Sequence, residues 1–121
     1  MIFDKYLEEA AKAMNGESNV VPSHLVVATD VNVIDPTMTS FTGEVVTRPA
    51  FTNTRLGRTI TRNAIFSGAS VPSGGITYRA AGSKPASSGG DLMTGVVYPG
   101  LTQTTDFDLE FLFEESFRRR T

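Results

Sequence analysis

The chain has no cysteine, no tryptophan and only one histidine among its 121 residues. Without cysteine it forms no disulfide, thiolate metal site or cysteine nucleophile. The single histidine, His24, would have to serve any Ser-His-Asp site, and a lone imidazole falls short of the usual zinc ligand set. His24 stands at the edge of a short apolar run, where a hydrogen-bonded structural histidine is the commoner role. We therefore expect no catalytic residue, metal or cofactor, and no enzyme.

Long apolar runs and a strong positive charge are also missing. No run approaches the roughly 20 apolar residues that a membrane-spanning helix requires. Asp4, Glu8 and Glu9 interrupt the first 14 residues, so these lack the apolar region of a signal peptide. The formal net charge of −2 argues against a general nucleic-acid binder, whose affinity depends on many cationic contacts to phosphates. We expect a product of a cytoplasm with no membrane or small-molecule partner.

Carboxylates offer two further patterns, and neither is complete. A calcium loop could begin at Asp30, but Asp35 stands where that loop requires glycine. Asp106, Asp108 and Glu110 alternate along a predicted strand and so share one of its faces. A glycosidase would need a second carboxyl group across a cleft, with a raised pKa on one of the two, and no pattern supplies it. We interpret these three carboxylates as a solvated strand face.

The N-terminus predicts a short amphipathic helix within residues 1–16. The apolar residues that recur at three- and four-residue spacings, and so share one face of a helix, are Phe3, Leu7, Ala10, Ala11 and Met14. Because an isolated helix of this length is marginal, this stripe must pack on something. It either completes the core or docks on a partner, and we favour the core. The predicted solvated face consists of Lys5, Glu8, Glu9 and Lys12.

After Gly16 the pattern changes to short strands rich in Val, Ile, Thr and Phe. Connections are too short for parallel crossovers, so we expect one domain (1–121) that forms an antiparallel β-sandwich or barrel of six to eight strands. The clearest alternation runs from Asp106 to Phe113. Two Gly/Ser-rich segments, 71–75 and 82–90, are predicted to be flexible loops. The expected strands are 24–29, 44–48, 51–55, 58–67, 76–81, 92–98 and 106–113.

Charge is divided unevenly along the chain. Residues 43–85 carry a net charge of +5, whereas residues 1–42 and 86–121 carry −4 and −3. Arginine dominates the basic block, and its planar fork suits interfaces. Either these arginines pair within the chain, for example with the 106–110 face, or complementary patches dock copies head to tail into a ring or lattice. The candidate contact residues are Arg48, Arg55, Arg58, Arg62, Gly74, Gly75, Gly89 and Gly90.

The sequence ends in three arginines, Arg118–Arg120. Such a run is usually a solvated terminus. It could instead contact nucleic acid or an acidic neighbour, although three phosphate contacts alone give weak, salt-sensitive binding.

Several segments follow one another in a recognisable order. These are the predicted helix and the following strand His24-Leu25-Val26-Val27-Ala28-Thr29, the stretch 43–48, the strand 76–81, the loop Ser88-Gly89-Gly90, the strand 92–99 and the final alternating strand 106–113. In this order they resemble small β-rich virion structural proteins of tailed bacteriophages. The resemblance implies a non-enzymatic virion part, present in many copies and assembled in the host cytoplasm. Its partners would be copies of itself and other virion proteins. We favour a tail or neck accessory such as a fibre adaptor, with capsid decoration (cement) protein as the alternative.

A second alternative is a small β module that binds a ligand such as a carbohydrate. Sugar sites usually use exposed aromatic side chains, and this chain offers only Tyr6, Tyr78 and Tyr98 besides phenylalanine. On this hypothesis Tyr78→Ala should abolish retention on a glycan array.

Overall fold

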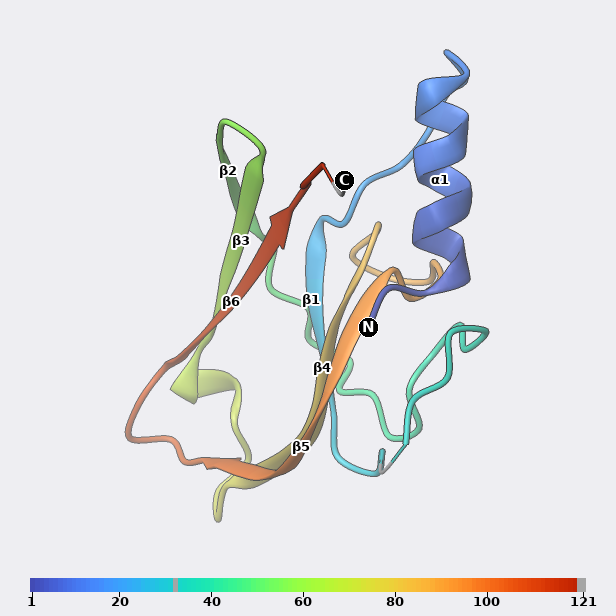
Figure 1. Ribbon diagram of the computed structural model, residues 1–121. Helices are drawn as coiled ribbons and strands as arrows, with labels where there is room; N and C mark the ends of the chain where they lie inside the picture. The colour runs from blue at the N-terminus through green and yellow to red at the C-terminus, as the bar shows by residue number, and fades with distance from the viewer. Residues whose placement is uncertain (32, 120–121) are drawn as a thin grey trace.

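The computed structural model describes residues 1–31 and 33–119, which form one α-helix, one short 3-10 turn and six strands. The strands make two three-stranded antiparallel sheets, which confirms the predicted mainly β sandwich with a short N-terminal helix (Figure 1). The elements are α1 (Asp4–Met14), β1 (His24–Ala28), β2 (Thr52–Leu56), β3 (Thr59–Phe66), η1 (Gly68–Ser70), β4 (Ile76–Lys84), β5 (Thr94–Gln103) and β6 (Leu109–Ser116).

The two sheets share one core. Sheet A has the order β1-β4-β5 and sheet B the order β2-β3-β6. Tyr78 of β4 is fully buried between them, and its ring makes edge contacts with Phe66 of β3 and Phe111 of β6 at centroid distances of 5.6 and 6.0 Å. Phe111 belongs to the predicted alternation of the last strand, and Leu109 and Phe113 of the same alternation also pack against this core. The other buried members are Leu25, Val27, Ala64, Val71 and Ala81.

Sheet A is buried on both faces, which explains why β1 is a continuous apolar run. A second cluster on its far side includes Val26, Ala28, Phe3 and Phe41. The paired glycines Gly82 and Gly95 make room for these aromatic rings. A Cβ atom at Gly95 would lie 2.8 Å from the Phe3 ring, and one at Gly82 would lie 2.4 Å from the Thr94 carbonyl oxygen. The glycines therefore permit close packing that a larger residue would prevent.

Two predicted elements differ from the structure: one predicted strand does not form, and one predicted loop begins later than expected. Residues 44–48 form no strand, because Glu44 and Arg48 turn their side chains to other segments and Pro49 has no N–H to donate. The segment still lies beside β1, where Val45 N donates to the Val27 carbonyl oxygen at 2.9 Å. The predicted loop 82–90 begins only at Pro85. Residues 82–84 belong to β4 and are buried, since Ser83 hydrogen-bonds Thr94 and Lys84 pairs with Glu44.

The last strand is also displaced relative to its prediction. β6 begins at Leu109, so Asp106 and Asp108 lie in the β5–β6 turn and not on the face of a strand. Asp108 Oδ1 accepts a hydrogen bond from Gly68 N at 2.8 Å, which holds this turn against η1. Only Glu110 of the three predicted carboxylates lies on the strand face, and it is exposed.

Candidate assembly interface

The apolar stripe of α1 does not pack into the core, contrary to the expectation that we favoured. Phe3 is fully buried, but Leu7 is 59% exposed and Met14 is 91% exposed. Ala10 and Ala11 of the same stripe are exposed as well. The helix instead turns Tyr6 and Glu9 toward the body of the protein. An apolar helix face thus lies open to solvent in the described structure.

Glu9, predicted to be solvated, explains this rotation. Its side chain is 5% exposed and forms ion pairs with Lys5 at 2.9 Å and Lys12 at 3.3 Å. Its second oxygen accepts a hydrogen bond from Val20 N at 3.1 Å, which ties the helix to the strap that leads to β1. Polar contacts on one side of α1 have therefore fixed the orientation of its apolar side.

Glu9 also gives the fold an acid-sensitive contact. The hydrogen-bonded ion pair with Lys5 is the main cause that lowers the Glu9 pKa from 4.5 to about 2. Because the folded-state pKa is the lower one, this contribution to stability is present above about pH 4.5 and is lost as the pH falls toward 2. We expect Glu9→Gln to remove part of the acid sensitivity of unfolding, whereas Glu8→Gln, at an exposed carboxylate, retains it. Carboxyl titration by NMR checks this: an ordinary pKa for Glu9 would refute it.

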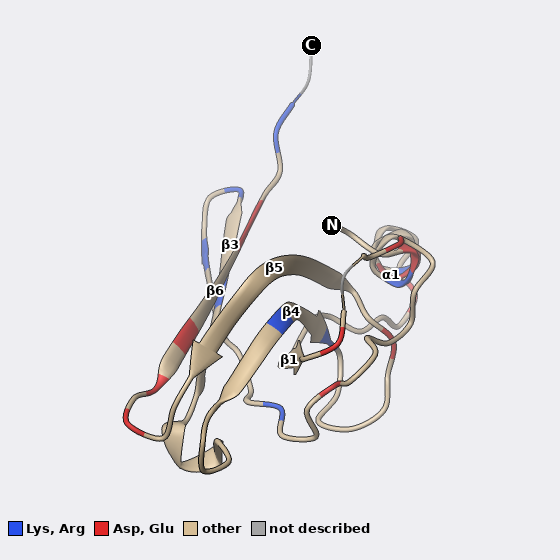
Figure 2. Cartoon of the chain, turned by 90° about the horizontal axis from the view of Figure 1, so that it is seen from below, with Lys and Arg blue, Asp and Glu red and all other residues tan. Residues whose placement is uncertain are grey.

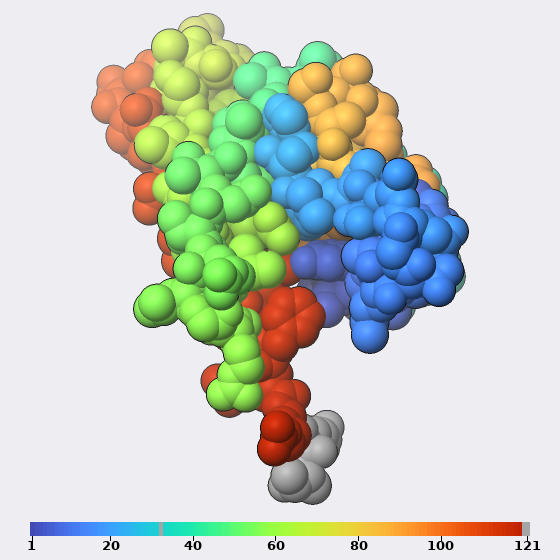
Figure 3. Space-filling model, turned by 90° about the horizontal axis from the view of Figure 1, so that it is seen from above, coloured from blue at the N-terminus to red at the C-terminus, as the bar shows by residue number. Residues whose placement is uncertain are grey.

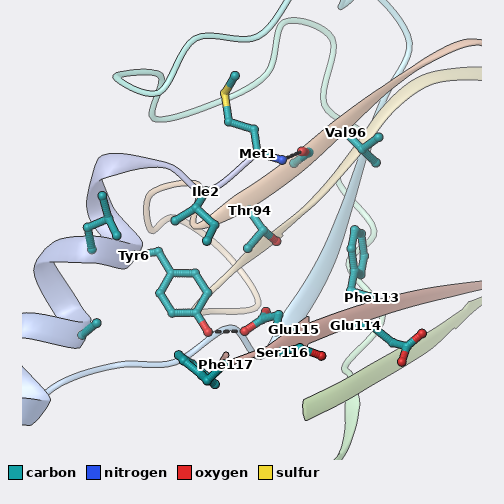
Figure 4. A pocket seen from close by; sticks show the side chains of 13 residues that line it. Met1, Ile2, Tyr6, Thr94, Val96, Phe113, Glu114, Glu115, Ser116 and Phe117 are labelled. Atoms are coloured by element: carbon teal, nitrogen blue, oxygen red, sulfur yellow. Dashed lines mark hydrogen bonds between the residues drawn. The ribbon is translucent and has the colours of Figure 1, made fainter. Parts of the chain in front are cut away.

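Beside the open face of α1 lies an apolar groove of about 450 Å³. Figure 3 shows it as the notch between the helix (blue) and the C-terminal strand (red), and Figure 4 shows its side chains. It lies between α1, the start of β5 and the end of β6, and these two strands are edge strands of sheet A and sheet B. The apolar side chains that line it come from Met1, Ile2, Leu7, Val96, Phe113 and Phe117.

One polar network closes the floor of this groove. Tyr6 donates a hydrogen bond to Glu115, and Arg62 Nε contacts the other oxygen of Glu115 at 3.2 Å (Figure 4 shows the tyrosine contact). Arg62 Nη1 also donates to the Pro22 carbonyl oxygen at 3.3 Å. Burial, followed by the Glu115 hydrogen bond, raises the pKa of Tyr6, so this phenol remains a neutral donor. The network joins α1 to sheet B through groups far apart in the sequence.

The predicted contact arginines divide into two classes. Arg48 and Arg62 have side chains only 10% and 6% exposed and are used inside the chain. Arg48 donates to the carbonyl oxygens of Ala86 and Gly89 at 3.1 and 2.7 Å, so it holds the 85–90 loop. Neither arginine pairs with the 106–110 segment that the sequence suggested as an internal partner; Glu44 and Glu115 take that role.

Arg55 and Arg58 lie together at the β2–β3 turn and are exposed. Arg118 and Arg119 extend past the same end of sheet B, where Phe117 N donates to the Arg58 carbonyl oxygen at 3.0 Å. We call this group the basic tip and define it as residues 55–58 with Arg118 and Arg119. A hollow of about 630 Å³ lies within it, between residues 57–59 and 116–119. Arg120 lies outside the described residues.

The predicted contact glycines do not join this group. Gly74 and Gly75 turn the chain before β4 with φ angles of +97° and +87°. Gly89 and Gly90 lie in the loop that Arg48 holds, with φ angles of +66° and +74°. The structure therefore places the predicted contact residues at several separate positions, and only Arg55 and Arg58 form part of one exposed patch.

At the opposite end of sheet B lies an acidic turn, which we define as Asp106-Phe107-Asp108. Figure 2 shows acidic residues at the β5–β6 turn and the start of β6, and basic residues at the β2–β3 turn and beyond β6, with Glu114 and Glu115 as further acidic residues at the end of β6. Phe107 is 43% exposed between the two aspartates. Gln103 sets the shape of this turn, because its buried Nε2 donates to the carbonyl oxygens of Phe66 and Phe107 at 2.8 and 2.9 Å.

We searched the described residues for the side-chain arrangements of a catalytic triad and of a metal site. Ser23 Oγ lies 2.8 Å from His24 Nδ1, but among the hydrogen bonds of residues 1–31 and 33–119 no carboxylate orients that ring, as a catalytic triad requires. The described part of the chain contains no cluster of three or more histidine and carboxylate side chains suited to a metal ion. Its one α-helix is too short and too polar to span a bilayer.

The tyrosines expected to serve a sugar site are occupied otherwise. Tyr78 is fully buried, so a Tyr78→Ala change would test the core and not a binding surface. Tyr6 is bonded to Glu115, and Tyr98 is half-buried against the core. This corrects the role that the sequence suggested for Tyr78.

Sequence reasoning missed two features that shape the surface. The fully buried side chain of Gln103 bonds groups that lie 37 and 4 residues away, a pattern that no local spacing reveals. The exposed flank of α1 could have been suspected from Glu9, since its carboxylate can pair with lysines both four residues before and three residues after it.

Comparison of the chain with protein-family models, with curated proteins and with solved structures gave no match.

Proposed function

We propose that the chain is a non-enzymatic structural subunit of a tailed-phage virion, present in many copies, which associates with itself and docks on another virion protein. Within the particle we place it at the tail or neck, as an accessory such as a fibre adaptor. The resemblance to small β-rich virion proteins supports the type of particle. The surface of the fold supports the mode of action.

The observation that carries this proposal is the open apolar surface made by α1 and the groove beside it. Met1, Ile2, Leu7 and Phe117 line the groove and are each more than half exposed, and Met14, on the same face of α1 as Leu7, is 91% exposed. Solitary soluble proteins seldom leave a contiguous apolar patch uncovered, and such patches commonly mark contacts with other proteins. A structural subunit has its surface completed only in the assembled particle, which accounts for this exposure.

A pair of substitutions tests whether the α1 stripe lies outside the core, as an assembly surface must. We expect Leu7→Ser and Met14→Ser to change the free energy of unfolding by less than about 0.5 kcal/mol, because both side chains are exposed. Phe3→Leu, at the buried start of the same stripe, should cost about 1 to 2 kcal/mol. Urea denaturation measures all three. If Leu7→Ser were as destabilising as Phe3→Leu, the stripe would belong to the core and the proposal would lose its main support.

Presence in the particle is tested separately. Purified virions of the phage that encodes the chain should contain it in many copies per particle, as measured by quantitative mass spectrometry. Crosslinks to tail or neck proteins are expected, whereas crosslinks to the major shell protein would favour the capsid decoration alternative. Absence from purified virions would contradict a structural role in the particle.

A further inference from the structure

We propose that copies of this chain associate head to tail, with the acidic turn of one copy (Asp106-Phe107-Asp108) seated on the basic tip of sheet B in the next copy. This inference rests on the proposed function and specifies one of its partners, a second copy of the chain. It arises from three observations: the placement of the two patches, their chemical match, and the hollow at the basic tip.

The two patches occupy opposite ends of the same sheet. β3 and β6 pair antiparallel from Thr59 with Ser116 at one end to Phe66 with Leu109 at the other. The basic tip adjoins the first pair and the acidic turn adjoins the second. At the rise of a β-strand this separates them by about 23 Å, far beyond the reach of an ion pair. The patches cannot neutralise each other within one copy, but two copies arranged in sequence bring them together. Such a contact is heterologous and continues into a ring or a filament.

The two patches carry opposite charges, and in each of them the charges flank a central apolar side chain. At the basic tip, Leu56 is 87% exposed between Arg55 and Arg58. In the acidic turn, Phe107 is exposed between two aspartates. Each patch therefore has an apolar centre flanked by charges, which is the arrangement of an interface with an apolar core and a charged rim. The apolar centres supply affinity, and the charges set the register and exclude contacts between like ends.

The hollow at the basic tip gives the aromatic ring a place to bind. It is formed by the β2–β3 turn and the chain beyond β6, and Phe117, which is 60% exposed, lies along it. Arg58, Arg118 and Arg119 line the same hollow. An entering phenylalanine ring finds an aromatic neighbour and guanidinium groups able to stack on its face. Two glutamates lie nearby: Glu115 is already paired with Arg62, and Glu114 points to the outer face of the sheet beside Thr61.

Both charged positions can be changed without disturbing the fold. In the part of the structure described, neither the Arg58 guanidinium nor the Asp106 carboxylate takes part in a hydrogen bond or ion pair, and both residues are exposed. Asp108 is unsuitable for this test, because its carboxylate holds Gly68 N. Arg58→Glu and Asp106→Arg are thus clean charge reversals, one at each patch.

The test is a charge swap followed by sedimentation equilibrium. Either Arg58→Glu or Asp106→Arg should weaken self-association by about tenfold or more, because each places like charges together across the contact. The double variant Arg58→Glu/Asp106→Arg restores opposite charges and should recover association to within about threefold of the unmodified chain. Asp91→Arg makes the same charge change as Asp106→Arg at an exposed position away from both patches, and Arg79→Glu matches Arg58→Glu. Both controls should associate normally.

Three results would overturn the proposal. Oligomers of the unmodified chain that are insensitive to both reversals would leave self-association intact but assign it to another surface. Single variants that dissociate without recovery in the double variant would show that the two patches do not meet. A chain that stays monomeric, yet loses binding to a DNA oligonucleotide on Arg58→Glu, would make the basic tip a polyanion site. In each case the count of copies in purified virions still tests the proposed function independently.

Discussion

Replacement of Arg62 by methionine is expected to lower the free energy of unfolding by about 3 to 5 kcal/mol. Arg62 is 5% exposed, and its guanidinium is the cation paired with Glu115 at the floor of the groove. Methionine fills much of the same volume but leaves the carboxylate of Glu115 without its counter-charge. The Glu115 side chain is only 15% exposed, so water compensates little for the missing counter-charge, and the bond to the Pro22 carbonyl oxygen is lost as well. Because domains are stable by only about 5 to 15 kcal/mol, this loss is a large fraction of the total.

The controls separate loss of a charge from loss of the network. Arg55→Met removes an exposed arginine from the same sheet and should change stability by less than about 0.5 kcal/mol. The double variant Arg62→Met/Glu115→Met should recover part of the loss, because it removes the unpaired carboxylate but leaves the Tyr6 hydroxyl and the Pro22 carbonyl oxygen without these partners. Urea denaturation, with midpoints and slopes compared, measures each variant. An Arg62→Met protein within about 1 kcal/mol of the parent would show that the network contributes little to stability.

Replacement of Gln103 by leucine is expected to cost about 3 kcal/mol or more and to loosen the acidic turn. The fully buried amide of Gln103 accepts a hydrogen bond from the Tyr78 hydroxyl at 2.7 Å and donates to the Phe66 and Phe107 carbonyl oxygens. Leucine leaves these three groups unpartnered, and each such buried group costs about 1 to 3 kcal/mol. Burial raises the pKa of Tyr78 to about 12, so its hydroxyl cannot escape the cost by ionising near neutral pH.

Tyr78→Phe is the matched control, because it removes only one of these hydrogen bonds and should cost about 1 kcal/mol. The turn should respond only to the change at Gln103. Amide hydrogen exchange across residues 104–108 is therefore expected to accelerate in Gln103→Leu and to stay near the parent rate in Tyr78→Phe. Equal stability of the two variants would show that the contacts of Gln103 to Phe66 and Phe107 contribute nothing.

Fold class was predictable from the sequence because it depends on local patterns. Alternation in the last strand and short Gly-rich connections indicated antiparallel sheets, and the structure confirms them. The bounds of single elements depend on tertiary contacts and were predicted less well. The hydrogen bond from Gly68 N to the Asp108 carboxylate keeps Asp108 in the turn, so β6 begins only at Leu109. Contacts of Ser83 and Lys84 likewise extend β4 into a segment whose glycine and serine content predicted a loop.

The candidate interface could be predicted only in part, for the same physical reason. Composition showed that arginines gather in the middle of the chain, but it could not show which of them are used internally. Arg48 and Arg62 find partners in loops and strands distant in sequence, whereas Arg55 and Arg58 lie at a turn with no acidic group opposite. The prediction that the apolar helix stripe packs into the core was wrong for a related reason. Its spacing marks an apolar face, but the buried contacts of Glu9 decide which face meets the body.

The mass of the purified protein in solution, measured at low and high salt, tests most directly whether copies associate through their charged ends. Light scattering on the purified chain at about 0.05 M and about 0.5 M NaCl measures it, since salt screens exposed charges strongly over this range. We expect a multiple of 13.0 kDa at low salt that falls toward 13.0 kDa at high salt. A mass of 13.0 kDa at both salt concentrations, even at the highest soluble protein concentration, would contradict self-association through the charged ends of sheet B.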